Sequence, residues 1–293
     1  GTNTGTITVT NTIDINGSGS EVQAAFAAIN TNTGNATAKI TGTDYTVAQL
    51  KAINAATTGA IVLADASGAL SGTVADIKDA FAGTITTHTG TLEISDAGTT
   101  DITATHITDI NGTNTGTITV TNTIDINGSG SEVQAAFAAI DTNTGNATAN
   151  VTGTDYTVAQ LKAINNATTG AIVLVSAGEA LSGDATDLAA ALAGTINYTG
   201  NVTVTDNAYT VTELKAINAG TTGDITLNSA GVALSGTVAN IKAAFAGTVT
   251  EHTGTLEISD ANTTDITATD ITDINGTNTG TITVTNTIDI NGS

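Results

Sequence analysis

The chain repeats itself, and this repetition constrains the fold more than any other feature of the sequence. Residues 1–29 recur letter for letter at 112–140, and the first 18 of them recur again at 276–293. Such self-similarity is typical of repeat architectures, in which each unit buries its apolar face against its neighbours. The chain therefore divides into larger repeats 1–111 and 112–275 and a partial repeat 276–293.

A recurring Thr-Gly step divides these repeats into segments of 23 to 31 residues, each beginning at a glycine. The segments fall into four types, which follow one another in the order A B C D, A B C B C D, A. A-type segments start at Gly5, Gly116 and Gly280, B-type at Gly34, Gly145 and Gly200, C-type at Gly59, Gly170 and Gly223, and D-type at Gly90 and Gly254. Repeat proteins lengthen by whole units. We therefore predict a single continuous array over residues 1–293.

Within a segment, the apolar period changes from two residues to three or four. After Gly90, Leu92 and Ile94 alternate with polar residues, which predicts a strand with one apolar face. In the following part of a B-type segment, Val47, Leu50 and Ile53 form the stripe of a short helix. D-type segments, rich in β-branched residues, give a weaker helical pattern, so we expect them to be irregular or extended.

Helix boundaries carry their own signals. A capping-box pattern, in which a threonine precedes Gln or Glu by three positions, begins three of the helical stripes, and a glycine lies just past the end of three others. The threonines are Thr46, Thr157 and Thr210, and the glycines are Gly83, Gly194 and Gly247.

A lone short strand and a ten-residue helix are both marginal in water, so stacking must supply their stability. We predict an α/β-solenoid with one parallel β-strand and one short α-helix in each coil, a coil being one segment. Stretches such as 12–15 and 69–71 are candidates for a brief second strand. An all-β parallel β-helix is the alternative fold.

Charge and composition exclude several classes of protein. Six Lys and Arg stand against 27 Asp and Glu, which gives a formal net charge of −21. A nucleic-acid-binding protein needs a basic face, so we expect no nucleic-acid partner. No apolar run approaches a membrane span, and we expect no membrane insertion. Without cysteine the chain has neither disulfides nor thiolate metal ligands.

Two stretches resemble a known group of proteins. The sequences TVAQLKAINAATTGAIVL at 46–63 and ALSGTVADIKDAFAG at 69–83 are similar to repeats of very large secreted surface proteins of bacteria, cyanobacteria in particular. The resemblance implies a secreted protein, located outside the cell or on its surface, that belongs to a surface layer, an adhesin or an extracellular fibre. It supplies no catalytic residues.

Internal copies provide a test for catalytic groups, because a repeated site should keep its residues. Tyr198 stands where other C-type segments have His88 and His252, and Asp270 replaces His106. We predict that the three histidines are solvated at the surface, with a pH-sensitive contact as the alternative, and that the chain is not an enzyme. The lysines of the B-type helices are either solvated or part of an ion-pair ladder; they are Lys51, Lys162 and Lys215.

The acidic residues allow two interpretations. One is a solvated surface that keeps a polymer soluble. The other is a set of weak calcium sites, because stacked Asp, Asn and carbonyl oxygens are calcium ligands. The calcium candidates are Asp14, Asp101, Asp109, Asp125, Asp265 and Asp273. No other cofactor is expected.

On two of the predicted strands, the side chains that point away from the core are apolar, whereas the corresponding side chains of neighbouring strands are polar. They indicate either a face that packs against another chain or incidental exposure of good strand formers. These assembly-face candidates are Ala60, Val62, Ala64, Ala171, Val173 and Val175.

Neither end of the sequence carries a visible polar cap, which is expected either of a window on a longer repetitive protein or of subunits that stack end to end. We therefore predict a self-assembling structural protein that forms an extracellular filament or surface coat through head-to-tail or lateral contacts. The alternative is the stalk of a surface adhesin, with or without bound calcium.

Overall fold

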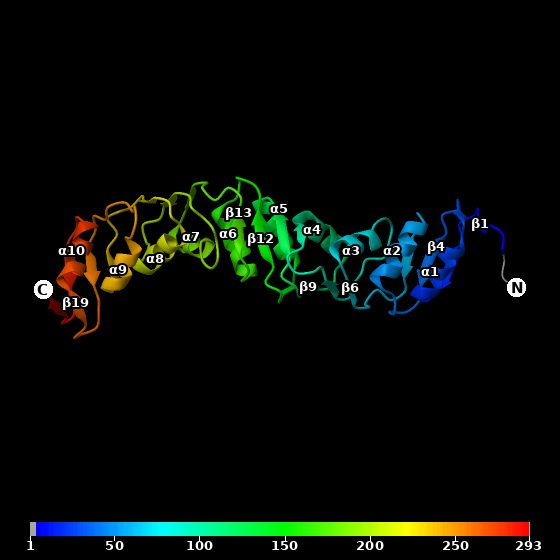
Figure 1. Ribbon diagram of the computed structural model, residues 1–293, viewed down its shortest axis with the longest axis horizontal. Coiled ribbons are helices and arrows are strands. Elements are labelled where there is room, and N and C mark those ends of the chain that lie inside the picture. The colour runs from blue at the N-terminus through cyan, green and yellow to red at the C-terminus, as the bar shows by residue number, and fades with distance from the viewer. Residues whose placement is uncertain (1–3, 293) are drawn as a thin grey trace. The chain divides into compact units, whose positions relative to one another are not determined.

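The computed structural model describes residues 4–292, which alternate between short strands and short helices (Figure 1). Its ten helices are α1 (Gly19–Ala28), α2 (Val47–Ala56), α3 (Val74–Ala80), α4 (Ala104–Thr113), α5 (Gly130–Ala139), α6 (Val158–Ala167), α7 (Ala185–Ala191), α8 (Val211–Gly220), α9 (Val238–Ala244) and α10 (Ala268–Gly276).

The described strands are between two and four residues long. They are β1 (Thr8–Val9), β2 (Asp14–Gly17), β3 (Thr31–Asn32), β4 (Thr37–Ile40), β5 (Ile61–Leu63), β6 (Leu70–Gly72), β7 (Leu92–Ile94), β8 (Asp101–Thr103), β9 (Ile118–Val120), β10 (Asp125–Gly128), β11 (Thr142–Asn143), β12 (Thr148–Val151), β13 (Ile172–Leu174), β14 (Leu181–Gly183), β15 (Val202–Val204), β16 (Ile225–Leu227), β17 (Leu234–Gly236), β18 (Leu256–Ile258), β19 (Asp265–Thr267), β20 (Ile282–Val284) and β21 (Asp289–Asn291).

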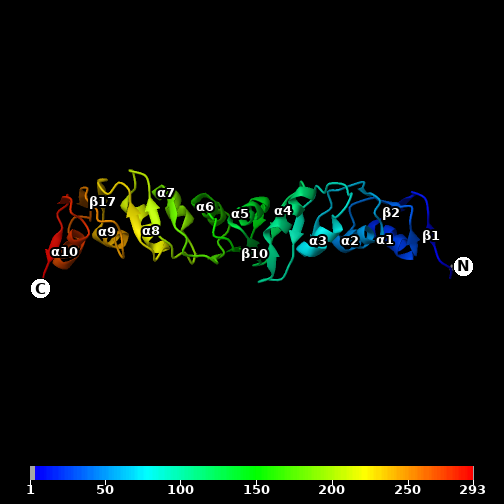
Figure 2. The same ribbon diagram turned by 90° about the horizontal axis from the view of Figure 1, so that it is seen from above.

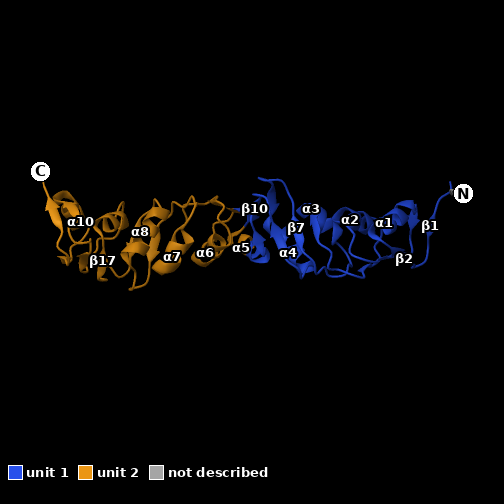
Figure 3. Cartoon of the chain, turned by 90° about the horizontal axis from the view of Figure 1, so that it is seen from below, with its two compact units in different colours: residues 1–128, 135–148 blue, residues 129–134, 149–293 orange. Residues whose placement is uncertain are grey.

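The chain divides into two compact units, shown in different colours in Figure 3. Unit 1 comprises residues 1–128 and 135–148, and unit 2 comprises residues 129–134 and 149–293. Each unit is a series of short parallel sheets with a row of helices.

In unit 1, most strands pair with a strand of the next segment, whereas β1 with β3 and β9 with β11 pair within one A-type segment. The sheet β2-β4-β5 is parallel, with Ile15 opposite Ala38 and Ala38 opposite Ile61. The sheet β6-β7-β9-β11 is also parallel, and it places Leu92 opposite Ile118. Helices α1, α2, α3 and α4 follow one another in the same order (Figure 1). The predicted parallel pairing is therefore confirmed.

Unit 2 follows the same plan (Figure 2). Strand β15 pairs with β14 and β16, so that Val202 lies opposite both Leu181 and Ile225. Strand β18 pairs with β17 and β20, and β19 pairs with β21, all in parallel. Helices α6 to α10 form the row, each packed against the next.

The core contains the apolar residues that the two periods identify. Leu92 and Ile94 on β7 are fully buried, as are Leu50 and Ile53 on α2. Every second residue of a strand and every third or fourth residue of a helix is apolar and points inward. Together these side chains form one interior within each unit. This part of the prediction is confirmed.

The helix boundaries also follow the sequence signals. Thr46, Thr157 and Thr210 form the predicted capping boxes at the starts of α2, α6 and α8. Gly83, Gly194 and Gly247 adopt left-handed backbone conformations just beyond α3, α7 and α9. Ser18 and Glu21 form a further capping box at α1.

Two expectations about the segments need correction. Only the B-type segments have a single strand; the C-type and D-type segments contain two, such as β5 and β6, and the A-type segments that start at Gly5 and Gly116 contain three. The D-type segments are not irregular, because each contains a helix, α4 or α10. In α4, Ile107 and Ile110 are buried at helical spacing, so burial overrides the low helix propensity of the β-branched residues.

Several glycines of the Thr-Gly steps lie very close to the backbone of a neighbouring segment within their unit. A Cβ added to Gly116 would lie 2.0 Å from the carbonyl oxygen of Gly90, and one added to Gly280 would lie 1.9 Å from that of Gly254. No side chain fits at these positions. The step therefore recurs because consecutive segments stack there with their backbones in contact.

Candidate functional site

Two of the histidines are buried, contrary to the sequence prediction. His88 and His252 are both fully buried, whereas His106 is half-buried. The two ring nitrogens of His88 lie 2.9 Å from Asn114 Oδ1 and 2.7 Å from the Gly68 carbonyl oxygen. His252 makes the same contacts with Asn278 and Val232. The histidines thus link successive segments inside the core.

Tyrosine has the same role in the C-type segment that starts at Gly170. The hydroxyl of Tyr198 donates to the carbonyl of Glu179, which occupies the place of Gly68 and Val232. The variation among copies is therefore an exchange between two side chains that hydrogen-bond the carbonyl at one position of the C-type segment.

The lysines of the B-type helices contact the next helix. Lys51 Nζ lies 2.7 Å from Asp76 and 2.9 Å from Asp79, and Lys162 forms an ion pair with Asp187. The hydrogen bond with Asp76 raises the pKa of the Lys51 ammonium. Lys215 hydrogen-bonds Asn240 instead, so the ladder interpretation holds for two of the three lysines.

Three of the calcium candidates form ion pairs with lysine. Asp14 pairs with Lys39 at 2.6 Å, Asp109 with Lys78 at 3.0 Å, and Asp273 with Lys242 at 2.8 Å. Lys242 also binds Asp270 and holds the pKa of that carboxyl at about 2. Each of these carboxylates therefore already has a cationic partner.

The other three candidates lie on strands of the D-type and A-type segments. Asp101 and Asp125 are opposite each other on β8 and β10, and Asn127 Nδ2 donates to Asp101 at 3.1 Å. Asp265 has the same relation to Asp289 and Asn291 on β19 and β21. Among residues 4–292, no group of three or more His, Asp or Glu side chains is arranged to hold a metal ion.

The assembly-face candidates point outward. Val62 and Val173 are exposed at the middle of β5 and β13, and Val175 is 69% exposed just after β13. Ala64 is exposed, while Ala60 and Ala171 are half-buried. In register, Val62 lies beside Lys39 and Val173 beside Asn150, so each apolar side chain has a polar neighbour on the adjacent strand.

A second apolar surface, which the sequence alone does not locate, lies at the first strands of unit 1. Ile7 is 38% exposed and Ile13 is 44% exposed, whereas their counterparts in the identical internal copy, Ile118 and Ile124, are fully buried. Helix α1 shows the same contrast, because Ala28 is exposed and the equivalent Ala139 is buried. We call Ile7, Ile13 and Ala28 the N-face.

The last strands of unit 2 expose another copy of the same residues. Val284 is 44% and Ile290 is 54% exposed, although the equivalent Val120 and Ile126 are fully buried. On the preceding helix α10, Ala268 is exposed, whereas the equivalent Ala104 on α4 is fully buried. We call Val284, Ile290 and Ala268 the C-face.

Strand pairing explains the contrast. In unit 1, β9 has a partner on each side, β7 and β11. Its copy β1 pairs with β3, and its copy β20 pairs with β18. Within the described residues, each of these copies therefore has one edge without a strand partner. The apolar side chains of both copies are exposed beside such an edge.

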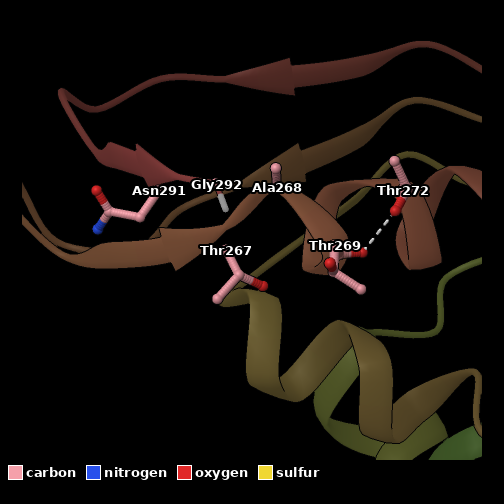
Figure 4. Close-up of a pocket in the computed structure, with 6 residues that line it drawn as sticks. All are labelled: Thr267, Ala268, Thr269, Thr272, Asn291 and Gly292. Carbon is pink, nitrogen blue, oxygen red and sulfur yellow. Dashed lines mark hydrogen bonds between the residues drawn. The ribbon is translucent and has the colours of Figure 1, made fainter.

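The C-face includes an open cavity of about 590 Å³ (Figure 4). It is lined by Thr267, Ala268, Thr269, Thr272, Asn291 and Gly292. Thr272 Oγ1 is bonded within the helix to the carbonyl of Thr269 at 2.8 Å. The cavity thus lies between the exposed side of α10 and the end of β21.

No local signal in the sequence marks these surfaces, because Ile7 and Ile118, like Ile13 and Ile124, lie in identical stretches. No described helix has the length and apolar character that crossing a membrane requires. No protein-family model matches the chain, and neither a curated protein nor a solved structure shows significant similarity to it.

Proposed function

We propose that the chain is a non-enzymatic structural protein whose segments are the coils of an α/β-solenoid. In this proposal, copies of the chain stack axially, the C-face of one on the N-face of the next, and form an extracellular filament or surface coat. The extracellular location is supported by the resemblance of 46–63 and 69–83 to secreted bacterial surface repeats.

One observation carries the proposal. The sequence of 276–293 occurs three times, and its apolar side chains are fully buried where they have strands on both sides. Ile118 on β9, between β7 and β11, is the example. A neighbour of the same kind would bury Ile7 and Ile290 equally well, because burial of apolar surface drives association.

The two faces differ from each other, which determines the kind of assembly. Contacts between unlike faces are heterologous, and each added copy presents a fresh face for the next one. Such contacts give a filament unless the rotation between copies closes a ring.

The test is the concentration dependence of assembly. We expect the unmodified chain to form species that grow with concentration in sedimentation velocity. Replacement of Ile7 and Ile13 by Asp should abolish this growth, because it places charge on the N-face. The matched control is Ala48→Asp/Ala159→Asp, which adds the same two charges at exposed positions of α2 and α6. An unmodified chain that remains monomeric at every concentration would refute the proposal.

A specific observation favours a second candidate, the stalk of an adhesin with calcium bound. Asp101 lies opposite Asp125, and Asp265 lies opposite Asp289. Like charges opposite each other on neighbouring strands repel, and a divalent cation would relieve that repulsion. This candidate requires calcium to raise the melting temperature, and Asp125→Asn to remove part of the increase.

A further inference from the structure

We propose that a cavity in unit 2, between α9 and α10, binds a primary ammonium group carried on a short aliphatic chain, as in a diamine. The cavity has a volume of about 510 Å³, and its lining includes Val238, Lys242, Asp260, Asp265, Ile266 and Asp270. The first two of these residues belong to α9 and the last to α10, while Asp265 and Ile266 belong to β19. The inference concerns a small-molecule site and is independent of the proposed assembly.

Asp260 points most clearly to a ligand, because it is a buried carboxylate with one oxygen to spare. It is only 8% exposed, and its Oδ2 accepts a hydrogen bond from the Val238 amide at 2.8 Å. Among residues 4–292, no group donates a hydrogen bond to Oδ1 or forms an ion pair with it. Every fully buried side-chain oxygen of the described chain has a hydrogen-bond partner, so Oδ1 keeps some accessible surface. Because Asp260 lines the cavity, Oδ1 is available there to a donor.

The cavity keeps a negative charge that its own lysine does not neutralise. Asp265 is exposed, and one of its oxygens accepts from Asn291 Nδ2 at 3.0 Å, which leaves the other oxygen free. Lys242 is the one cationic residue of the lining, and its Nζ is already held by Asp270 at 2.7 Å and by Asp273 at 2.8 Å. The charges of the two carboxylates with free oxygens therefore remain, and a cavity lined by one sign of charge attracts the opposite sign.

Each of these two carboxylates offers a single oxygen, and this selects the kind of cation. A guanidinium binds best to both oxygens of one carboxylate, which neither Asp260 nor Asp265 can supply. Calcium needs at least about six oxygen ligands, far more than these two carboxylates leave free. A primary ammonium is a compact charge with three donors, so it can bond single oxygens of different carboxylates. Val238 and Ile266 line the same cavity and supply apolar surface for its alkyl chain.

The equivalent residues of unit 1 repeat this lining with one difference. Asp96 is 7% exposed and accepts from the amide of Val74, the first residue of α3, at 2.7 Å. The buried carboxylate with one hydrogen-bonded oxygen therefore occurs in both units. However, His106 stands where unit 2 has Asp270, so the copy in unit 1 has one carboxylate fewer. We therefore place the stronger site in unit 2.

Isothermal titration calorimetry of the full chain tests the site, with 1,4-diaminobutane as the probe. The matched ligand is the fully methylated diamine, which has the same charge but no N–H donor. We expect saturable binding of the diamine and at least about tenfold weaker binding of the methylated form, because the latter cannot donate to the free oxygens. No saturable binding, or equal affinity for the two ligands, would overturn the proposal.

Variants of the chain locate the site. Asp265→Asn should weaken binding of the diamine about tenfold, because it removes the charge from one acceptor. The matched control is Asp224→Asn, which removes an exposed charge of the same unit outside the lining and should change the affinity less than about twofold.

Asp270→His reproduces the lining of unit 1, where α4 is helical with His106, and should weaken binding more than about twofold. Circular dichroism shows whether each variant is folded. Equal weakening by Asp265→Asn and Asp224→Asn would mean that the diamine responds only to the overall charge of the chain, and it would overturn the site.

Discussion

His88 Nδ1 lies 2.9 Å from Asn114 Oδ1 in the core of unit 1, across two successive segments. The amide of Asn114 donates in turn to the Gly116 carbonyl at 2.8 Å, and its Oδ1 accepts from the Gly116 amide at 3.3 Å. This small network holds a C-type segment against a D-type segment, because its His88–Asn114 contact joins residues that are 26 positions apart.

We expect His88→Ala to lower the free energy of unfolding of the chain by about 3 kcal/mol, because it leaves a buried carbonyl without its partner and opens a cavity beside Phe81. His106→Ala, at a half-buried position, should change it by less than about 0.5 kcal/mol. Urea denaturation of both variants measures the difference. Equal changes in the unfolding free energy of the two variants would show that the His88 network does not stabilise the fold.

Two replacements of glycine by alanine should have opposite effects on stability. Gly116→Ala places a Cβ 2.0 Å from the Gly90 carbonyl oxygen, so we expect a destabilisation of about 3 kcal/mol or more. Gly112→Ala, within α4 and with nothing within 4 Å of the added Cβ, should stabilise the protein by about 0.5 kcal/mol. Thermal unfolding distinguishes the two, and a tolerated Gly116→Ala would exclude the close backbone approach.

The buried tyrosines predict loss of stability in alkali. Burial raises the pKa of Tyr209 to about 12, with a further contribution from Asp206, and its hydroxyl donates to the Ser229 carbonyl at 2.6 Å. Because the folded state favours the neutral phenol, this stabilisation is complete below pH 10, the ordinary pKa, and is lost as the pH rises towards 12.

Ultraviolet absorbance of the phenolate, recorded together with circular dichroism, checks this prediction. We expect ionisation of Tyr209 to be delayed beyond that of a free tyrosine and to accompany unfolding. Tyr209→Phe should weaken the alkaline dependence while removing the hydrogen bond to Ser229. Ionisation at the ordinary pKa without any structural change would contradict the burial of this side chain.

The helix-to-helix ion pairs are predicted to contribute little. Lys51 and Asp76 have side chains that are 41% and 46% exposed, and ion pairs of this kind are worth less than about 1 kcal/mol. Lys51→Met should therefore change the melting temperature only slightly, and salt should reduce the effect further. A large loss of stability would mean that the pair organises the stacking of α2 on α3.

The apolar periods were sufficient to predict much of the fold. Leu92 and Ile94 alternate as strand residues do, Leu50 and Ile53 have helical spacing, and Thr46 gives a capping box; all were placed correctly. These signals are local, since each depends on a few neighbouring residues. The helix α4 was missed because its threonines and isoleucines resemble a strand locally, and only burial against neighbouring segments makes it helical.

The candidate site was harder to predict, because it depends on contacts between segments. His88 is buried because it packs against the next segment, where it contacts Asn114. The two residues are 26 positions apart, so no short sequence pattern reveals this contact. The exposure of Ile13 and the burial of Ile124 cannot be told apart from sequence at all, since their surroundings in the chain are identical for many residues. What differs is the segment stacked on each.

The most direct test of the central claim is electron cryo-microscopy of the unmodified chain at increasing concentration, with and without EDTA. Axial stacking predicts filaments with a repeat of about 4.8 Å along the axis, and contacts made by apolar residues and strands predict that the filaments survive EDTA. Filaments that dissolve in EDTA would instead make calcium the agent of assembly. Separate particles of constant length at every concentration would contradict the claim.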